Sequence, residues 1–183
     1  MLHNEKELIK RIAEGETELF SHIAEHYAQA VHTLIIRIVG SEEDAEELTQ
    51  DVFIKAYEQM ESFSGRSSFA TWLYRIAYNC AISFTRHKRQ QYLQIDENRL
   101  RLVDDVEVEQ IEAIADNEQM LDALARAIEQ LNAEERALVT LFYYEERSVS
   151  ECAEIVGQSQ NNIKVRLHRI RKKLYILIQD ETK

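Results

Sequence analysis

The chain has 183 residues, of which 45% are hydrophobic, and this suffices for one ordinary domain or two small ones with hydrophobic cores. Pro is absent and Gly occurs only four times, a composition that favours helices and lacks the turn residues of hairpins, so we expect an all-α fold. The formal net charge is −11, no run of 18 apolar residues occurs, and the first residues lack a signal-peptide pattern, so we expect a soluble cytoplasmic protein.

Three helices are predicted in the N-terminal half. Apolar residues at helical spacing predict core faces on the first two helices: Leu19, Phe20, Ile23, Tyr27, Val31 and Leu34, then Leu48, Val52, Phe53, Ala56 and Tyr57. The pattern Ser41-x-x-Asp44 is typical of a helix start and predicts where the second helix begins. A third helix is predicted from about Phe69 to His87, after the polar loop SFSGRSS. We therefore expect a helical domain over residues 1–92.

One short motif in the first helix suggests a zinc enzyme. His22 to His26 has the H-x-x-E-H form of the inverted zinc peptidases. With Phe20 set at zero, the two His project at about 200° and 240°, away from the apolar stripe, so we expect both to face solvent. A catalytic zinc also needs a third protein ligand and a shaped cavity, and no later motif provides these. We expect no metal or cofactor, and two reduced, buried thiols at Cys80 and Cys152.

Aromatic and basic residues alternate in the segment over residues 62–90. It contains five basic residues and, between residues 63 and 92, no acid. Any one of its rings is more often a core residue than a ligand contact. Together, however, rings and cations suit single-stranded DNA, whose unstacked bases bind aromatic faces. The segment therefore predicts a surface that captures a melted strand.

The next segment, residues 93–117, is acidic. It holds eight acids against Arg99 and Arg101, and its apolar pattern is less regular, so we interpret it as a partly helical linker. A second helical domain is expected over residues 118–183. Charge is thus segregated, because residues 136–183 carry a net charge of +3 while the whole chain carries −11.

The C-terminal sequence SVSECAEIVGQSQNNIKVRLHRIRKKL predicts a helix-turn-helix. Ser148 and Glu151 form a capping box, Gly157 closes the first short helix, and Ser159 is placed to cap the next. Apolar residues then recur at spacings of four, three and four, which seats the second helix on the first: Ile163, Leu167, Ile170 and Leu174.

The other faces of this last helix are expected to bind duplex DNA. The residues that fall off the apolar stripe are mostly cationic: Lys164, His168, Arg169, Arg171, Lys172 and Lys173. Gln160 and Asn161 in the first turn offer amides. Amides read base edges in the major groove and cations neutralise phosphates, so the pattern predicts sequence-specific duplex binding. The net charge of −11 opposes such binding by the protein alone.

Three motifs together resemble the extracytoplasmic-function group of bacterial sigma factors. They are DAEELTQDVFIKAY over residues 44–57, SSFATWLYRIAYN over residues 67–79, and the C-terminal motif above. Their order and spacing are also similar to that family. The resemblance implies a two-domain initiation subunit that joins core RNA polymerase and catalyses no reaction itself.

The resemblance also implies three sets of site residues. A core polymerase set would meet the beta-prime clamp: Asp44, Glu46, Glu47, Gln50, Asp51 and Lys55. A minus-10 set would hold the nontemplate strand: Ser62, Phe63, Gly65, Arg66, Ser67, Phe69, Trp72, Arg75 and Asn79. A minus-35 set would read duplex: Ser159, Gln160, Asn161, Lys164, Val165, His168, Arg169 and Lys172.

Further partners follow from the same resemblance. The C-terminal domain would also meet the beta flap of polymerase, and the linker would pass through channels that otherwise hold nucleic acid. An anti-sigma factor, often membrane-anchored in the family, would hold the protein inactive. No small-molecule substrate is expected.

The sequence departs from the family pattern near the DNA-reading helix. Leu131-Asn132 replaces a common Leu-Pro, although Asn132 with Glu135 can still form a helix cap. Val165 stands where Ser is common, and Asn161-Asn162 where Gly-Thr is common. Because of these changes, the resemblance does not predict which promoter sequence the protein recognises. A second hypothesis also stays open, namely an autonomous helix-turn-helix regulator whose N-terminal helices sense a signal or dimerise.

Overall fold

The computed structural model describes residues 5–88, 99–100, 103 and 118–181. Within these ranges every regular element is helical, which confirms the all-α prediction. None of the described helices is long and apolar enough to span a bilayer. The predicted linker over residues 93–117 lies outside the described residues except at positions 99, 100 and 103. There, Leu100 and Val103 pack on Ile176.

The N-terminal group consists of α1 (Glu5–Ala13), α2 (Phe20–Val39), α3 (Glu42–Glu58) and α4 (Phe69–Lys88), with short 3₁₀ turns at Thr17–Leu19 (η1) and Met60–Ser62 (η2). Gly40 ends α2 with a φ of 75°, which only Gly adopts readily, and its N–H donates to the Ile36 carbonyl. Ser41 then caps α3, accepting a bond from the Asp44 amide at 3.4 Å, as predicted. This tight junction folds α3 back along α2.

The C-terminal group consists of α7 (Glu118–Glu129), α8 (Ala133–Val139), a π-turn at Thr140–Tyr144 (η4), α9 (Val149–Val156) and α10 (Gln160–Glu181). Both predicted capping boxes are formed, Asn132 with Glu135 before α8 and Ser148 with Glu151 before α9. Gly157 ends α9 in the left-handed region, with a φ of 73°. The helix-turn-helix prediction is therefore confirmed in its local details.

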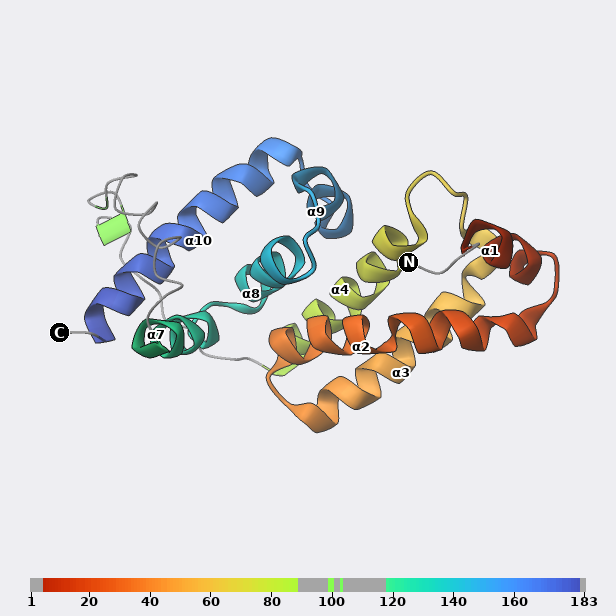
Figure 1. The fold of residues 1–183 in the computed structure, drawn as a ribbon, viewed down its shortest axis with the longest axis horizontal. Coiled ribbons are helices and arrows are strands. Elements are labelled where there is room, and N and C mark those ends of the chain that lie inside the picture. The colour runs from red at the N-terminus through yellow and green to blue at the C-terminus, as the bar shows by residue number, and fades with distance from the viewer. Residues whose placement is uncertain (1–4, 89–98, 101–102, 104–117, 182–183) are drawn as a thin grey trace.

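The two groups pack against each other (Figure 1). α9 packs against α4, and α8 packs against α2. Buried residues from both groups form one continuous hydrophobic cluster. At its edge the Arg136 guanidinium donates to the Ile38 carbonyl at 2.8 Å. The described helices therefore share a core rather than forming two isolated bundles.

Most residues of the predicted core stripes are buried, Leu19, Phe20 and Phe53 are half-buried against the core, and one residue is a clear exception. On α3, Leu48, Val52 and Ala56 face the core, whereas Tyr57 is 45% exposed and only touches the edge of the Phe20 ring, at 5.3 Å between centroids. The prediction of Tyr57 as a core residue is wrong. Consecutive helical residues lie 100° apart, so Tyr57 points aside once Ala56 faces inward.

Candidate polymerase and nucleic-acid interfaces

Helix α10, the predicted recognition helix, begins with a side-chain cap. The Ser159 hydroxyl accepts a bond from the Asn162 amide at 3.2 Å, which confirms the predicted cap. Behind it, the predicted apolar stripe is buried against the other helices of the C-terminal group: Ile163, Leu167, Ile170 and Leu174. This stripe fixes which face of α10 points outward.

The predicted minus-35 residues lie on that outward face. Most of them are exposed: Ser159, Gln160, Asn161, Lys164, Val165 and Arg169. His168 and Lys172 are half-buried. The Gln160 amide also donates to the Ser150 hydroxyl at 3.1 Å, which ties the start of α10 to α9. The structure thus brings the whole set together on one end of α10.

Two basic residues of α10 instead bind side chains of this same chain. Lys173 donates to the Glu135 carboxylate at 2.6 Å, and its side chain is only 16% exposed. Arg166 donates to Glu134 at 3.0 Å and to the Gln158 side chain at 3.1 Å. The expectation that Lys173 lies on a free face is therefore wrong. Glu135 comes next to α10 only through packing, and sequence spacing gives no sign of it.

A hollow of about 430 Å³ opens between α8 and α10. The paired carboxylates of Glu134 and Glu135 line it, together with Asn162, Val165 and Arg169. Among the described residues no group of three His, Cys, Asp or Glu is placed to hold a metal ion. His22 and His26 are both exposed on α2, as predicted. The zinc hypothesis thus gains no support from the geometry.

The predicted minus-10 residues lie on a loop and on one side of α4. In the loop, Ser62, Gly65 and Arg66 are exposed and Ser67 is half-buried. Gly65 has a φ of 67°, and the Ser68 hydroxyl accepts a bond from the Thr71 amide at 3.1 Å. The loop therefore enters α4 through a formed cap.

Three aromatic members of the minus-10 set form one cluster. Phe63, Phe69 and Trp72 lie 5.3 to 5.5 Å apart, centroid to centroid. Phe63 and Trp72 are half-buried, but Phe69 is only 3% exposed and also contacts Tyr27. The prediction that Phe69 touches DNA is corrected, because its ring fills the core. Arg75 and Asn79, one turn apart on α4, are exposed.

The predicted core polymerase residues share an outer face of α3. Glu46, Glu47, Gln50, Asp51 and Lys55 are exposed, and Asp44 is half-buried. Lys55 donates to the Cys80 sulfur at 3.3 Å, and Cys80 is half-buried rather than buried as predicted.

Ile54 is a surface residue that the sequence reading missed. It is 56% exposed and lies three or four residues after Gln50 and Asp51, on the same stripe of α3. The sequence does contain a sign of this surface position. Ile54 lies off the apolar stripe of the helix, three residues after Asp51 and four before Glu58.

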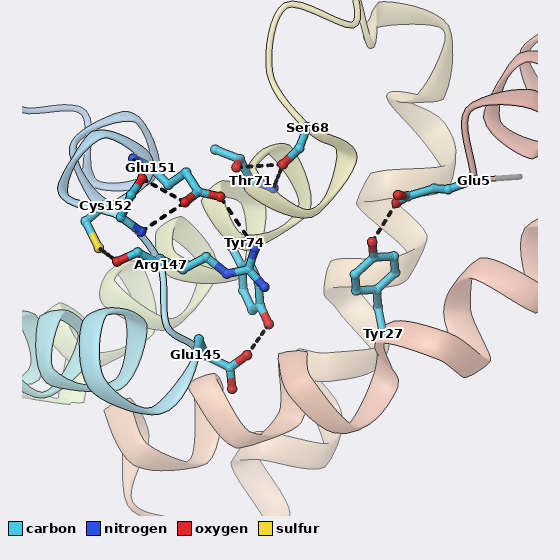
Figure 2. Close-up of polar contacts among 10 residues, drawn as sticks. Glu5, Tyr27, Ser68, Thr71, Tyr74, Glu145, Arg147, Glu151 and Cys152 are labelled. Carbon is cyan, nitrogen blue, oxygen red and sulfur yellow. Dashed lines mark hydrogen bonds and ion pairs between the residues drawn. The ribbon is translucent and has the colours of Figure 1, made fainter. Parts of the chain in front are cut away.

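The side of α4 that faces α9 carries buried polar groups (Figure 2). The Tyr74 hydroxyl donates to Glu145 at 2.5 Å, and the Arg147 guanidinium lies 5.0 Å from the Tyr74 ring centroid. Burial, and then the neighbouring Glu145, raise the pKa of Tyr74 well above its usual value. Burial likewise raises the pKa of the Cys152 thiol to about 11, so this thiol stays protonated near neutral pH.

Comparison with known families gives two matches, in chain order. Residues 23–91 match Sigma-70 region 2, and residues 121–174 match Sigma-70, region 4. The first match spans α2 to α4 and the second spans most of the C-terminal group. The matched ranges therefore contain all of the predicted site residues.

Curated relatives align over almost the full chain. The ECF RNA polymerase sigma factor SigW of Bacillus subtilis is 29% identical over 182 residues, covering 96% of this chain and 97% of the relative. The ECF RNA polymerase sigma-E factor of Escherichia coli K12 is also 29% identical, over 177 residues, covering 90% of this chain and 89% of the relative.

Two solved structures have a similar fold. One is CnrH in complex with the cytosolic domain of CnrY, with a TM-score of 0.66 at 20% identity, covering 95% of this chain and 96% of that one. The other is the sigma factor RpoE in complex with the anti-sigma factor NepR from Bartonella quintana, with a TM-score of 0.61 at 22% identity, covering 87% of this chain and 96% of that one.

Proposed function

The chain belongs to the extracytoplasmic-function group of the sigma-70 family, and on that premise we propose how its helical groups divide promoter recognition. A member of this family is a sigma factor, which binds core RNA polymerase and directs transcription initiation. We assign residues 1–92 to core binding and the minus-10 element, residues 93–117 to a linker, and residues 118–183 to the minus-35 element. The matches at 23–91 and 121–174 support these boundaries.

The observation that carries the minus-35 role is the outward face of α10. Asn161, Lys164, Val165 and Arg169 stand exposed on a helix whose opposite stripe is buried. A helix presented in this way fits the major groove, where amides and Arg read base edges and Lys binds phosphate. Val165, 52% exposed, offers an apolar surface that suits a thymine methyl group.

The minus-10 role rests on the loop before α4 and on its exposed neighbours. Arg66, Arg75 and Asn79 are exposed beside the half-buried rings of Phe63 and Trp72. Rings and cations side by side suit an unstacked strand. In this proposal Phe69 supports the other two rings from the core and does not contact DNA.

The core polymerase role is assigned to the outer face of α3. Glu47, Gln50 and Asp51 are exposed there around Ile54. An apolar residue ringed by polar ones is typical of a protein interface. The acidic N-terminal half thereby contacts a protein partner, which removes the conflict between net negative charge and DNA binding.

Two further properties follow from this function. The protein catalyses no reaction itself, because polymerase supplies the chemistry. It works in the cytoplasm, where polymerase and the chromosome are located. An anti-sigma factor is a further expected partner, since RpoE from Bartonella quintana was solved with one.

In vitro transcription tests the proposal. Core polymerase free of other sigma factors is incubated with a promoter library, with and without the protein. We expect new start sites that share motifs near minus-35 and minus-10. An autonomous regulator would instead bind duplex tightly by itself, would not comigrate with core polymerase, and would produce no new starts, and that result would overturn the proposal.

A further inference from the structure

Helix α1 lies outside both ranges that match the sigma-70 family, because the first match begins at residue 23. The helix is nevertheless packed on the N-terminal group. One face carries Leu8, Ile9 and Ile12, and Ile12 is only 4% exposed in the core. α1 also contacts η2, the short turn that leads into the predicted strand-binding loop. A helix without an assigned role thus adjoins the segment proposed to bind the minus-10 element.

The turn after α1 holds this helix against the rest of the group. Gly15 has a φ of 112°, which Gly adopts readily, and its amide donates to the Ile12 carbonyl at 3.1 Å. The Arg11 guanidinium donates twice to the Glu16 carboxylate, and one of these bonds measures 2.8 Å. The chain therefore reverses direction here, and α1 packs against η1.

Glu5 links α1 to α2 through a hydrogen bond. It lies one and two turns before the apolar residues of α1, so its carboxylate shares their inward face. The Tyr27 hydroxyl donates to this carboxylate at 2.5 Å (Figure 2). A carboxylate acceptor makes such a bond stronger than one between neutral groups. Burial, and then Glu5, raise the pKa of Tyr27 well above its usual value, so the hydroxyl remains a donor near neutral pH.

The Tyr27 ring contacts the aromatic cluster of the minus-10 set. Its centroid lies 5.8 Å from that of Phe69, and the two planes are tilted by 50°. Phe69 in turn lies 5.5 Å from Phe63 and 5.3 Å from Trp72, centroid to centroid. Phe69 is 3% exposed, so its ring is held by its neighbours. Because interiors are close-packed, a change in the orientation of Tyr27 alters the packing of Phe69 and of the two rings beyond it.

A continuous series of contacts therefore runs from α1 to the proposed strand-binding surface. It passes from Glu5 to Tyr27 by a hydrogen bond, and from the Tyr27 ring through Phe69 to Trp72 by ring contacts. A second contact joins α1 to η2, where Met60 is 4% exposed just before the loop. Binding sites depend on side chains held in one orientation by the residues behind them. α1 thus contacts the loop directly and the rings through Tyr27.

We propose that Glu5 and Tyr27 are positioning residues for minus-10 recognition, and that α1 holds the rings of Phe63 and Trp72 in the orientation that captures a base. Neither positioning residue contacts DNA, because both act through Phe69. The inference rests on the proposed function and adds to it a helix outside the matched ranges. Loss of the bond leaves the cluster formed but less ordered before it binds, so strand capture weakens while binding to polymerase and to the minus-35 element does not.

Tyr27→Phe is the central test variant, and Tyr74→Phe is its matched control. Tyr27→Phe keeps the ring against Phe69 and removes only the hydroxyl that binds Glu5. Tyr74 also donates to a carboxylate, that of Glu145 at 2.5 Å, but this bond lies on the side of α4 that faces α9 (Figure 2). A general effect of losing a buried tyrosine hydroxyl will appear in both variants. Glu5→Ala removes the acceptor, whereas Glu5→Gln keeps an acceptor without the charge and should lose less.

Two measurements on the full chain test the proposal. The first is acrylamide quenching, in the free protein, of the fluorescence of Trp72, the single tryptophan of the chain. Quenching should increase in Tyr27→Phe and Glu5→Ala and stay at the wild-type value in Tyr74→Phe.

The second measurement is binding of the holoenzyme to a single-stranded nontemplate oligonucleotide, taken from the minus-10 region of a start site found in the transcription assay. We expect this binding to be about threefold to tenfold weaker in Tyr27→Phe and Glu5→Ala. Affinity for core polymerase and the minus-35 footprint should be unchanged, whereas a general loss of folded protein would lower all three. Circular dichroism checks the helix content.

Three results would overturn the proposal. One is a folded Tyr27→Phe in which either the strand affinity or the quenching of Trp72 stays at the wild-type value. Another is an equal loss of strand affinity and polymerase affinity, which would assign Glu5 and Tyr27 to stability alone. The third is the same loss of strand affinity in Tyr74→Phe.

A double variant tests whether the two residues act as one unit. Tyr27→Phe with Glu5→Ala should bind the strand no more weakly than either single variant, because both changes remove one bond, and additive losses would contradict the proposal. Failure of the proposed sigma function is distinguishable, because the wild type itself would then give no new start sites. The quenching of Trp72, which needs no polymerase, would still report whether α1 holds the cluster.

Discussion

Helix α4, proposed to bind the melted strand, and helix α10, proposed to read duplex DNA, are similar in length but differ in how much of each is buried. α4 has 20 residues without an acid, and it packs against α2, α3 and α9. α10 has 22 residues, and the outer face of its first half stays open to solvent. The first helix is part of the core as well as a candidate DNA surface. The second presents its candidate DNA face without depending on that face for stability.

This difference in burial follows from the residue types of the two helices. Aromatic residues such as Phe69 and Tyr74 bury large apolar areas, so a helix rich in them is drawn into the core. Exposed cations such as Lys164 and Arg169 lose little by staying in water. Changes on α4 should therefore affect stability and promoter opening together, whereas changes on the face of α10 should affect only DNA recognition.

Trp72→Ala should have the largest effect, because Trp72 contributes both to the stability of the core and to the proposed strand-binding surface. The loss of a half-buried ring from the cluster with Phe63 and Phe69 should lower the free energy of unfolding by about 2 kcal/mol. Loss of base stacking should reduce open-complex formation further, by about tenfold. Permanganate footprinting and denaturant titration measure the two losses. Trp72→Phe should recover most of both, and open-complex formation at the wild-type level in Trp72→Ala would contradict the strand-capture role.

Arg169→Ala should weaken minus-35 binding with little change in stability. Loss of a base or phosphate contact costs about 1–3 kcal/mol, or about 5- to 150-fold in affinity, while an exposed substitution changes stability by about 0.5 kcal/mol or less. Footprinting of the holoenzyme on a minus-35-dependent promoter measures this. Arg126→Ala, at an arginine exposed on α7, is the control. An intact minus-35 footprint in Arg169→Ala would remove this residue from the DNA face.

A pair of glycine substitutions compares the two groups directly. Gly40 and Gly157 have φ values of 75° and 73°, and an added Cβ would meet no atom within 4 Å at either site. Each Gly→Ala change should therefore cost about 1 kcal/mol through the backbone alone. Thermal unfolding is followed by circular dichroism and by fluorescence of Trp72, the single tryptophan of the chain, which lies in the N-terminal group.

Because the groups share one core, we expect both glycine variants to shift the two signals together. If Gly157→Ala shifts only the circular dichroism signal, the two groups unfold independently. This pair therefore also bears on the docking of the two groups.

Two helix caps should give the smallest effects, and unequal ones. Ser148 belongs to a capping box, with its amide donating to Glu151 at 2.9 Å, whereas Ser41 accepts a single bond at 3.4 Å. We expect Ser148→Ala to cost about 1 kcal/mol and Ser41→Ala about 0.5 kcal/mol, measured by denaturant titration. An equal or reversed order would show that bond length and reciprocity do not set the strength of these caps.

Helix limits and caps were predictable because they depend on residues close in the chain. Ser41, Asn132 and Ser148 each have their partner three residues later, and Gly157 follows directly on the helix that it ends. The buried stripe of α10 was predictable for the same reason, since Ile163 to Leu174 recur at one helical period. Local sequence also resembled the sigma-70 family in three motifs, which fixed the expected order of the site residues.

The roles of individual side chains depended on contacts between distant segments. Lys173 is held by Glu135, 38 positions away, and Phe69 sits in a cluster with Tyr27. Tyr57 and Ile54 lie beside the core stripe of α3, where periodicity alone does not separate core from surface. A spacing rule says which face a residue is on, but only packing says what covers that face.

The sequence by itself thus determined an all-α chain, its helix-turn-helix and the two surfaces expected to bind DNA, because helical period, capping and charge are properties of short segments. Only the tertiary structure decided that Tyr74 meets Glu145 and that α9 covers α4. The physical reason is that such contacts arise when separate apolar faces bury each other, and hydrophobic burial has no direction that a local pattern could encode.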